Sequence, residues 1–250
     1  MNEILKSIRK KILTISALKK AGHVASSLSV VEILYFLHKN SCEDDRVILS
    51  KGHASLALYA VLNSLQKISD EDLISFCDFD SILGGHPDRS KLPVTVASTG
   101  SLGHGLPIAV GISLAKKTNS QSGKVYCVIG DGESNEGTIW ESALLASHLK
   151  LDNLVCVIDD NDSQTRSVTT SLLLEKFKSF GWQSTYIDDG NSLEEIEKAL
   201  NSLSSQTSPV CFVAKTKKGF GVKEIQRDMF TWHHKSPSSE ELSRFMEELS

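Results

Sequence analysis

The chain of 250 residues has 40% apolar and 23% charged residues, a formal net charge of -4 at pH 7 and a pI near 6.1. This balance is typical of a globular protein with a full core, and it excludes the basic field with which proteins bind nucleic acids. No apolar stretch approaches the roughly 18 residues that a membrane span requires. We therefore expect a soluble protein with no nucleic acid and no membrane partner.

Five cysteines occur without a C-x-x-C pair, and Cys127, Cys156 and Cys211 each lie within an apolar run. An odd number of cysteines in this setting predicts buried free thiols rather than a disulfide framework. Free thiols are usual in a reducing compartment, which favours a cytoplasmic location.

The first predicted element is an amphipathic helix at the start of the chain. Apolar residues such as Ile8 and Ile12 recur at helical spacing, and lysines between residues 6 and 20 occupy the other face. Glu3 and this periodicity favour a helix over a transit peptide. Residues 1–78 are predicted to be mainly helical, with Ser27 or Ser29 as the N-cap of a second helix.

A long loop and a series of strands follow this helical part. Residues 81–105 are rich in Gly, Pro, Ser and Thr, which predicts an ordered functional loop. Short β-rich runs then alternate with helical patterns, at residues 124–129, 153–158, 183–187 and 209–214. Continuous apolar runs are typical of parallel strands that are covered on both faces. The sequence therefore predicts an α/β fold: a doubly wound parallel sheet with helices on both faces, in a single domain of residues 1–250.

The first of these strands runs directly into Gly130-Asp131-Gly132-Glu133, and a helix is expected from about residue 138 to 149. Glycine on both sides of Asp131 permits a tight turn and the close approach of an anionic ligand. Amide groups at the start of a helix favour phosphate oxygens. This segment is therefore a candidate phosphate site.

A second polar segment ends the next strand, at Asp159-Asp160-Asn161. Asn161 lies about 30 residues beyond Asp131, which is the length of one strand–helix–strand unit. Mg²⁺ prefers oxygen ligands from one or two carboxylates, completed by phosphate and water. Asp131 and Asn161 are therefore predicted to hold a metal that is shared with a diphosphate.

Four of the eight histidines directly follow glycine: His23, His53, His86 and His104. Glycine lets the backbone approach a ligand, and imidazole donates or accepts protons near neutral pH. The repeated pair therefore favours a polar pocket, whereas His38 and His148 lie in predicted helices and are expected to have no chemical role.

The stretch GDGESNEGTIWESALLASHLKLDNLVCVIDDN resembles the thiamine diphosphate motif of transketolases, especially the N-terminal subunits of the split, two-chain kind. Further segments match the family in the same order, at residues 22–29, 50–54, 85–89, 98–105, 215–221 and 232–237. The resemblance covers nearly the whole chain. It implies thiamine diphosphate as cofactor, bound with Mg²⁺ or with Ca²⁺ or Mn²⁺ in its place.

The resemblance also implies roles for the histidines. His53 and His233 correspond to residues that contact the diphosphate, and His86 to one that bonds the terminal hydroxyl of the donor sugar. His23 and His233 correspond to the pair that handles the proton of the acceptor aldehyde. Glu136 matches a glutamate at the subunit boundary that links paired active sites; alternatively, it is a carboxylate favoured by the helix dipole.

The remaining site residues are implied in the same way. Gly100 and Leu102 correspond to backbone contacts with the thiazolium and pyrimidine part of the cofactor. The implied cofactor-binding set also contains Ser101, Gly130, Asp131, Gly132, Glu133 and Asn161. The implied metal ligands are Asp131, Asn161 and the main-chain carbonyl of Ser163.

The activity implied is that of a transketolase-like transferase, which moves a two-carbon ketol unit from a ketose or its phosphate to an aldose acceptor. In this family a separate pyrimidine-binding domain brings the activating glutamate, and the roughly 36 residues after Ala214 are too few to form it. A C-terminal subunit is therefore the expected partner, in an α2β2 heterotetramer.

Several positions depart from the family pattern. Val24-Ala25 replaces the usual Pro-Gly, His104 stands where glutamine is common, and residues 164–169 lack an Asp-Gly. These departures are compatible with pentose phosphate metabolism or with a specialised substrate. Two alternatives are left open: a subunit of another thiamine diphosphate enzyme, with a 2-oxo acid as substrate, and a non-catalytic cofactor-binding subunit.

Overall fold

Five parallel strands form one sheet in the order β1-β2-β3-β5-β4. The computed structural model describes residues 2–164, 172–203 and 207–250. The strands are β1 (Arg46–Leu49), β2 (Val125–Gly130), β3 (Leu154–Asp160), β4 (Gln183–Ile187) and β5 (Val210–Lys215). The predicted parallel α/β sheet is confirmed. β1 was not predicted, because its short apolar run lies within the mainly helical part of the sequence.

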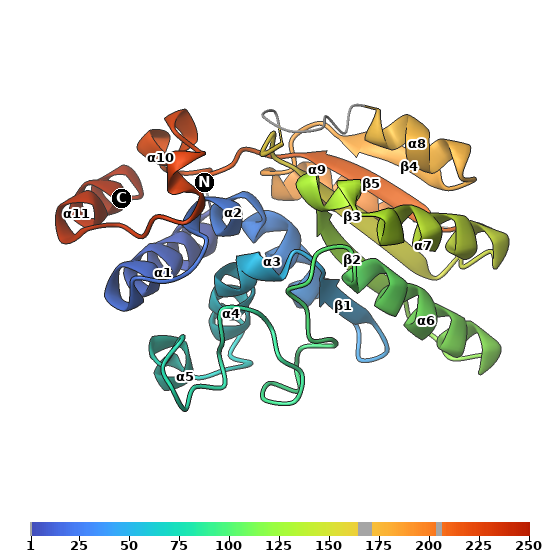
Figure 1. Cartoon of the computed structure of the whole chain (residues 1–250), viewed down its shortest axis with the longest axis horizontal. Helices are drawn as coiled ribbons and strands as arrows, with labels where there is room; N and C mark the ends of the chain where they lie inside the picture. Colours follow the sequence, from blue (N-terminus) through green and yellow to red (C-terminus); the bar gives the residue numbers. More distant parts are fainter. Residues whose placement is uncertain (1, 165–171, 204–206) are drawn as a thin grey trace.

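Helices cover both faces of this sheet (Figure 1). One face packs against α1 (Glu3–Lys19), α2 (Val24–Ser29), α3 (Val31–Asn40), α4 (Ser55–Ser64) and α9 (Leu193–Asn201). The other packs against α6 (Gly105–Thr118), α7 (Gly137–His148) and α8 (Leu173–Ser179). Side chains alternate between the faces: Val128 packs in the first core, whereas Cys127 and Ile129 pack in the second. Burial on both faces explains why β2, β3 and β5 are largely apolar.

The first helix is amphipathic, as predicted. Asn2 caps α1 by accepting a hydrogen bond from the Ile4 amide at 3.0 Å, and Ile8 and Ile12 are fully buried. Arg9 is also buried on this helix, where its guanidinium donates to both carboxylate oxygens of Glu32 at 2.7 and 2.8 Å. This ion pair ties α1 to α3.

The predicted caps at Ser27 and Ser29 are wrong. Both serines lie inside α2, and Val30 separates α2 from α3 without any side-chain cap. The hydroxyl of Ser29 instead donates to Asp159 Oδ2 at 2.7 Å. The Ser29 hydroxyl therefore bonds a buried carboxylate of β3 instead of capping a helix.

The long loop between α5 (Asp70–Ile74) and α6 is held by hydrogen bonds, as an ordered loop requires. The hydroxyl of Ser55 donates to the Gly85 carbonyl at 2.8 Å, and that of Thr99 donates to the Leu49 carbonyl at 2.7 Å. The bond from Thr99 holds the last part of the loop against the carboxyl end of β1. The chain is completed by α10 (Lys223–Arg227), α11 (Ser239–Glu248) and three short 3-10 helices, η1 (Gly52–Ala54), η2 (Gly132–Asn135) and η3 (Thr231–His233).

Three buried cysteines lie side by side across the sheet. Cys127 of β2 pairs in register with Cys156 of β3, which pairs with Cys211 of β5, and all three are free and fully buried. The prediction of buried free thiols is confirmed for these residues. In the part of the chain that the structure describes, no helix is both long and apolar enough to cross a bilayer.

Candidate functional site

A pocket of about 260 Å³ opens at the carboxyl ends of β2 and β3. Parallel α/β sheets bind ligands at this edge. The pocket gathers eleven of the residues singled out from the sequence, namely His23, His53, Gly100, Leu102, Gly130, Asp131, Gly132, Glu133, Asn161, Ser163 and His233. Residues more than 200 positions apart in the sequence thus line one cavity.

The candidate metal ligands converge on one backbone amide. The N–H of Ser163 donates to Asp131 Oδ2 at 2.9 Å and to Asn161 Oδ1 at 3.2 Å. The hydroxyl of Ser163 donates to Asp131 Oδ1 at 2.7 Å. Burial raises the pKa of Asp131, and the hydrogen bond from Ser163 opposes this shift. A carboxylate and an amide oxygen therefore face a common point, as an oxygen-ligated cation requires.

The buried carboxylate of Asp159 orients Asn161, one of these candidate ligands. Asp159 is fully buried and accepts hydrogen bonds from Ser29 at 2.7 Å and from the Asn161 side-chain amide at 3.0 Å. It also binds the hydroxyl of Thr216 and the ammonium of buried Lys51. Because the side-chain NH₂ group of Asn161 donates to Asp159, the side-chain oxygen of Asn161 faces the pocket.

Glu133 joins three segments around the pocket. One carboxylate oxygen accepts from the Ser50 hydroxyl and, at 2.8 Å, from the Gly103 amide, while the other accepts from the Gly130 amide at 3.1 Å. Burial raises the pKa of this carboxyl, and the hydrogen bonds from Ser50, Gly103 and Gly130 oppose the shift. These contacts connect the ends of β1 and β2 to the loop before α6.

Close packing of the loops requires a glycine at position 52. A Cβ atom on Gly52 would lie 2.8 Å from the backbone nitrogen of Gly100, a separation that real Cβ atoms essentially never show. Only glycine allows the loop after β1 and the loop that carries Gly100 and Leu102 to meet. The pocket wall therefore depends on this contact.

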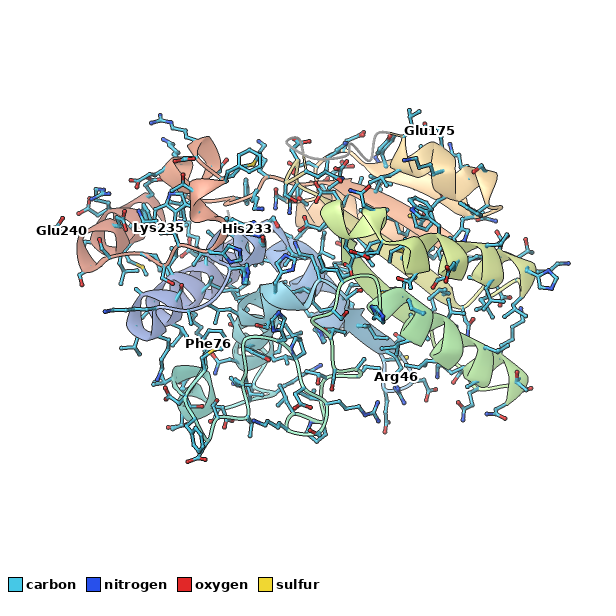
Figure 2. The ribbon with its side chains drawn as sticks, in the orientation of Figure 1. Arg46, Phe76, Glu175, His233, Lys235 and Glu240 are labelled. Atoms are coloured by element: carbon cyan, nitrogen blue, oxygen red, sulfur yellow. The ribbon has the colours of Figure 1, made fainter. Side chains whose placement is uncertain are left out.

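Three histidines, His23, His53 and His233, line the pocket, and the ring of His234 packs against two of them. The ring centroids of His23 lie 5.2 Å from His53, 5.5 Å from His233 and 4.5 Å from His234. Figure 2 shows His233 near the middle of the molecule, where η3 packs against α2. Burial lowers the pKa of His23 and His233 to about 4 and that of His53 to about 2. These three imidazoles are therefore neutral near pH 7.

Two lysines supply positive charge at the pocket. Lys51 lines it, and Lys218 Nζ lies 3.0 Å from His233 Nδ1. Burial and the charge of Lys51 lower the pKa of Lys218 to about 8. Both lysines were missed as site residues in the sequence, although they stand in the matching segments at residues 50–54 and 215–221. An anionic ligand is stabilised by nearby cations, so the lysines within the matching segments could have been singled out on that ground.

Comparison with known proteins identifies the family. The family described as "Transketolase, thiamine diphosphate binding domain" matches residues 2–244. The chain belongs to this transketolase family. The predicted family and fold are thereby confirmed.

Relatives of this transketolase domain occur as separate subunits and as parts of longer chains. The chain is 36% identical over 260 residues to an apulose-4-phosphate transketolase subunit of Actinobacillus succinogenes, covering 98% of this chain and 94% of the relative. Human transketolase is 36% identical over 245 residues, covering 91% of this chain but 38% of the relative. The transketolase structure from Campylobacter jejuni superposes with a TM-score of 0.85 at 29% identity, covering 99% of this chain and 43% of that one. The chain thus spans about two fifths of single-chain transketolases.

Three predicted site residues of this transketolase domain do not line the pocket. His86 is exposed, with its ring packed so closely against Gly100 that a Cβ there would lie 3.0 Å from it. Ser101 and Glu136 are exposed as well. Residues 165–169 of the divergent loop lie outside the described residues.

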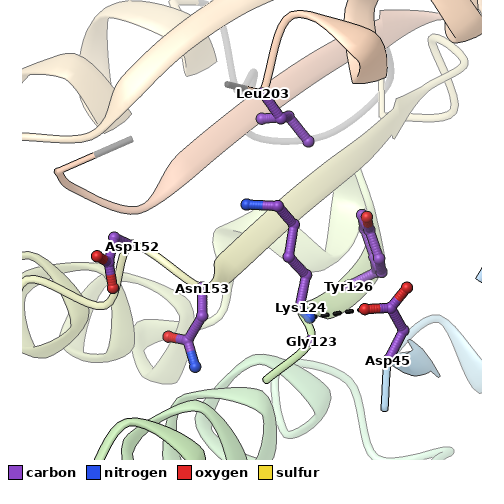
Figure 3. A pocket seen from close by; sticks show the side chains of 7 residues that line it. All are labelled: Asp45, Gly123, Lys124, Tyr126, Asp152, Asn153 and Leu203. Carbon is purple, nitrogen blue, oxygen red and sulfur yellow. Dashed lines mark hydrogen bonds between the residues drawn. The ribbon is translucent and has the colours of Figure 1, made fainter. Parts of the chain in front are cut away.

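A second hollow lies at the opposite edge of the sheet (Figure 3). It is lined by Asp45, Gly123, Lys124, Tyr126, Asp152, Asn153 and Leu203. The Lys124 amide donates to Asp45 Oδ1 at 2.7 Å, so one of its acidic groups is already engaged. This hollow contains none of the residues that the transketolase resemblance singles out, and it lies at the amino ends of the strands.

Proposed function

We propose that this chain is the thiamine diphosphate-binding subunit of a two-chain transketolase. Residues 1–250 act as a single diphosphate-side domain, and the complete enzyme transfers a two-carbon ketol unit from a ketose or its phosphate to an aldose acceptor. The observation that carries this proposal is the convergence of Asp131, Asn161 and three histidines, His23, His53 and His233, on one pocket at the carboxyl edge of the sheet.

The residues of the pocket fit a metal-bound diphosphate. The oxygens of Asp131 and Asn161 that accept from the Ser163 amide would ligate Mg²⁺, or Ca²⁺ or Mn²⁺ in its place, with the Ser163 carbonyl as a further ligand. Gly130 and Gly132 line the pocket without side chains, so phosphate oxygens can approach the backbone closely, and Lys51 and Lys218 balance part of the phosphate charge. When bound, thiamine diphosphate supplies the chemistry that breaks and forms the carbon–carbon bond.

The histidines handle protons and hydrogen bonds around the reacting sugars. His23 and His233 are neutral at pH 7, so either can take a hydroxyl proton as the carbon–carbon bond of the donor breaks and return it to the carbonyl oxygen of the acceptor as the new bond forms. His53 and His233 bind the diphosphate as neutral hydrogen-bond donors. His86 lies beside Gly100 at the open side of the loop, where it bonds the terminal hydroxyl of the donor.

A second polypeptide completes the active site. The relatives from Actinobacillus succinogenes and Phocaeicola vulgatus are both named as subunits of an enzyme, and this chain spans 94% and 91% of them. The partner is a C-terminal subunit with the pyrimidine-binding domain and its activating glutamate, in an α2β2 heterotetramer of the cytoplasm. Exposed Glu136, at the start of α7, lies at the boundary between subunits.

The names of these two relatives suggest the substrate class. Both are called apulose-4-phosphate transketolases, so apulose 4-phosphate is the donor that we propose to test first. This substrate is consistent with the divergent sequence at Val24-Ala25 beside His23. Ordinary pentose phosphates are the comparison.

The test begins with the partner. Tagged chain is purified from its native cell with Mg²⁺ and thiamine diphosphate, and the protein that co-purifies is identified by mass spectrometry. Ketol transfer is then measured with each chain alone and with both, and we expect activity only with both chains. Release of CO₂ from a 2-oxo acid without ketol transfer would overturn the proposal. No turnover with the stoichiometric partner would instead indicate a non-catalytic cofactor-binding subunit.

A further inference from the structure

A second set of candidate ligands consists of two histidines that line the pocket and a third beside them. His23, His233 and His234 each offer one ring nitrogen, and these nitrogens lie within 4.8 Å of one another. His234 is exposed, whereas the other two are partly buried. His234 has no role in the function proposed above.

The spacing of these nitrogens is close to that of a three-histidine metal site. Zinc binds imidazole nitrogen at about 2.0–2.1 Å in tetrahedral geometry, which places neighbouring ligand atoms about 3.3 Å apart. Small side-chain rotations would therefore close the set around one ion, and exposed His234 is free to make the largest of them. The fourth position would remain open, as in catalytic zinc sites with three protein ligands.

We propose that His23, His233 and His234 form a binding site for a borderline transition metal such as Zn²⁺. This site differs in chemistry from the pair Asp131 and Asn161, because imidazole nitrogen favours Zn²⁺, Cu²⁺ and Ni²⁺ whereas carboxylate and carbonyl oxygens favour Mg²⁺. The chain thus carries a nitrogen site and an oxygen site that both draw ligands from the lining of one pocket.

The neighbouring charges decide how the metal binds. Lys218 Nζ lies 3.0 Å from His233 Nδ1, so a metal on His233 either binds through Nε2 or displaces this contact. Lys218 opposes any cation electrostatically, which selects for metals with a high intrinsic affinity for imidazole. A metal held here would cover His23 and His233 and would thereby inhibit the ketol transfer that we propose.

Metal binding can be measured without any catalytic activity. Tag-free chain that carries Cys42→Ser and Cys77→Ser, to remove the exposed thiols, is titrated with Zn²⁺ by calorimetry in excess Mg²⁺. We expect one Zn²⁺ per chain, and His234→Ala should weaken this binding by at least about 10-fold. His148→Ala, at the exposed end of α7, is the matched control and should leave the affinity unchanged.

Substitution of Co²⁺ for Zn²⁺ gives an independent readout, because its visible absorption reports the coordination geometry. A tetrahedral spectrum that is lost in His234→Ala supports the site. An equal Zn²⁺ affinity in His234→Ala and in the parent chain, or complete competition by Mg²⁺, would overturn the proposal. Failure of the ketol transfer assay bears on the proposed function and leaves this binding result intact.

Discussion

The buried pair Lys51–Asp159 allows a stability prediction that can be worked out from its contacts. The side chains of Lys51 and Asp159 are 1% and 0% exposed. Asp159 has three further donors, from Ser29, Asn161 and Thr216, whereas the Lys51 ammonium has one further acceptor, the Ser26 carbonyl at 3.4 Å. Loss of one partner therefore has unequal consequences for the other.

Asp159→Asn leaves a buried ammonium without its counterion, which should cost about 4 kcal/mol of unfolding free energy. Lys51→Met leaves a carboxylate that is still hydrogen-bonded three times, so we expect a loss of about 2 kcal/mol. The double variant has neither buried charge, and its loss should be about 3 kcal/mol rather than the sum of the two. The resulting coupling energy is about 3 kcal/mol.

Urea denaturation followed by circular dichroism measures all four members of this cycle at pH 7. The same substitutions in the surface pair Lys117–Asp152, whose side chains are 40% and 43% exposed, are the matched control. Their coupling should stay below about 1 kcal/mol. Additivity of the buried pair within about 0.5 kcal/mol, or a smaller loss in Asp159→Asn than in Lys51→Met, would refute the reasoning.

Three further predictions concern the ligand site, a buried histidine and a loop contact. Asp131→Asn should weaken the binding of thiamine diphosphate with Mg²⁺ by about 100-fold, because a charged ligand is lost; an unchanged Kd in calorimetry would contradict its role. Burial lowers the pKa of His38 to about 3, so its neutral form stabilises the fold above pH 6.5 and this stability is lost as the pH falls toward 3. Between pH 7 and pH 5, the unfolding free energy of His38→Leu should therefore fall by about 2 kcal/mol less than that of the parent chain. Parallel plots of unfolding free energy against pH for the two proteins would contradict this prediction. Gly52→Ala should destabilise the chain by about 1–3 kcal/mol, because its Cβ would meet the Gly100 backbone. Gly111→Ala, whose Cβ would meet nothing within 4 Å, should be neutral or stabilising, and equal effects of the two substitutions would reject the loop contact.

Much of the sheet could be predicted because parallel strands buried on two faces leave a continuous apolar run. The run at residues 124–129 corresponds to β2 (Val125–Gly130), and the run at 153–158 to β3 (Leu154–Asp160). β1 could not be predicted in this way, since Arg46–Leu49 has only three consecutive apolar residues. Its place at the edge of the sheet is set by pairing with β2, a contact of nearly 80 residues in sequence separation.

Site residues could be predicted where they directly follow a strand in the sequence. They could not be predicted where their role depends on a partner that is distant in the sequence. Asp131 and Asn161 follow strands, so their meeting at one edge follows from the parallel topology. Ser29 was expected to cap a helix, but its hydroxyl bonds Asp159 across 130 residues. Lys51 and Lys218 belong to the same class, because only the folded chain shows that both face an anion site. Local propensity carries no information about such partners.

The three buried cysteines that lie side by side across the sheet are probes of the opening of the core, because their thiols react only when they are exposed. Cys42 and Cys77 are exposed and should react with a thiol reagent in the folded chain, whereas Cys127, Cys156 and Cys211 become accessible only when the core between the sheet and α6, α7 and α8 opens. Mass spectrometry after a pulse of alkylation would count the thiols labelled at each moment. Because the three cysteines belong to three neighbouring strands, simultaneous labelling would mean that this face of the sheet is uncovered as one unit, and stepwise labelling would reveal the order in which its parts are uncovered.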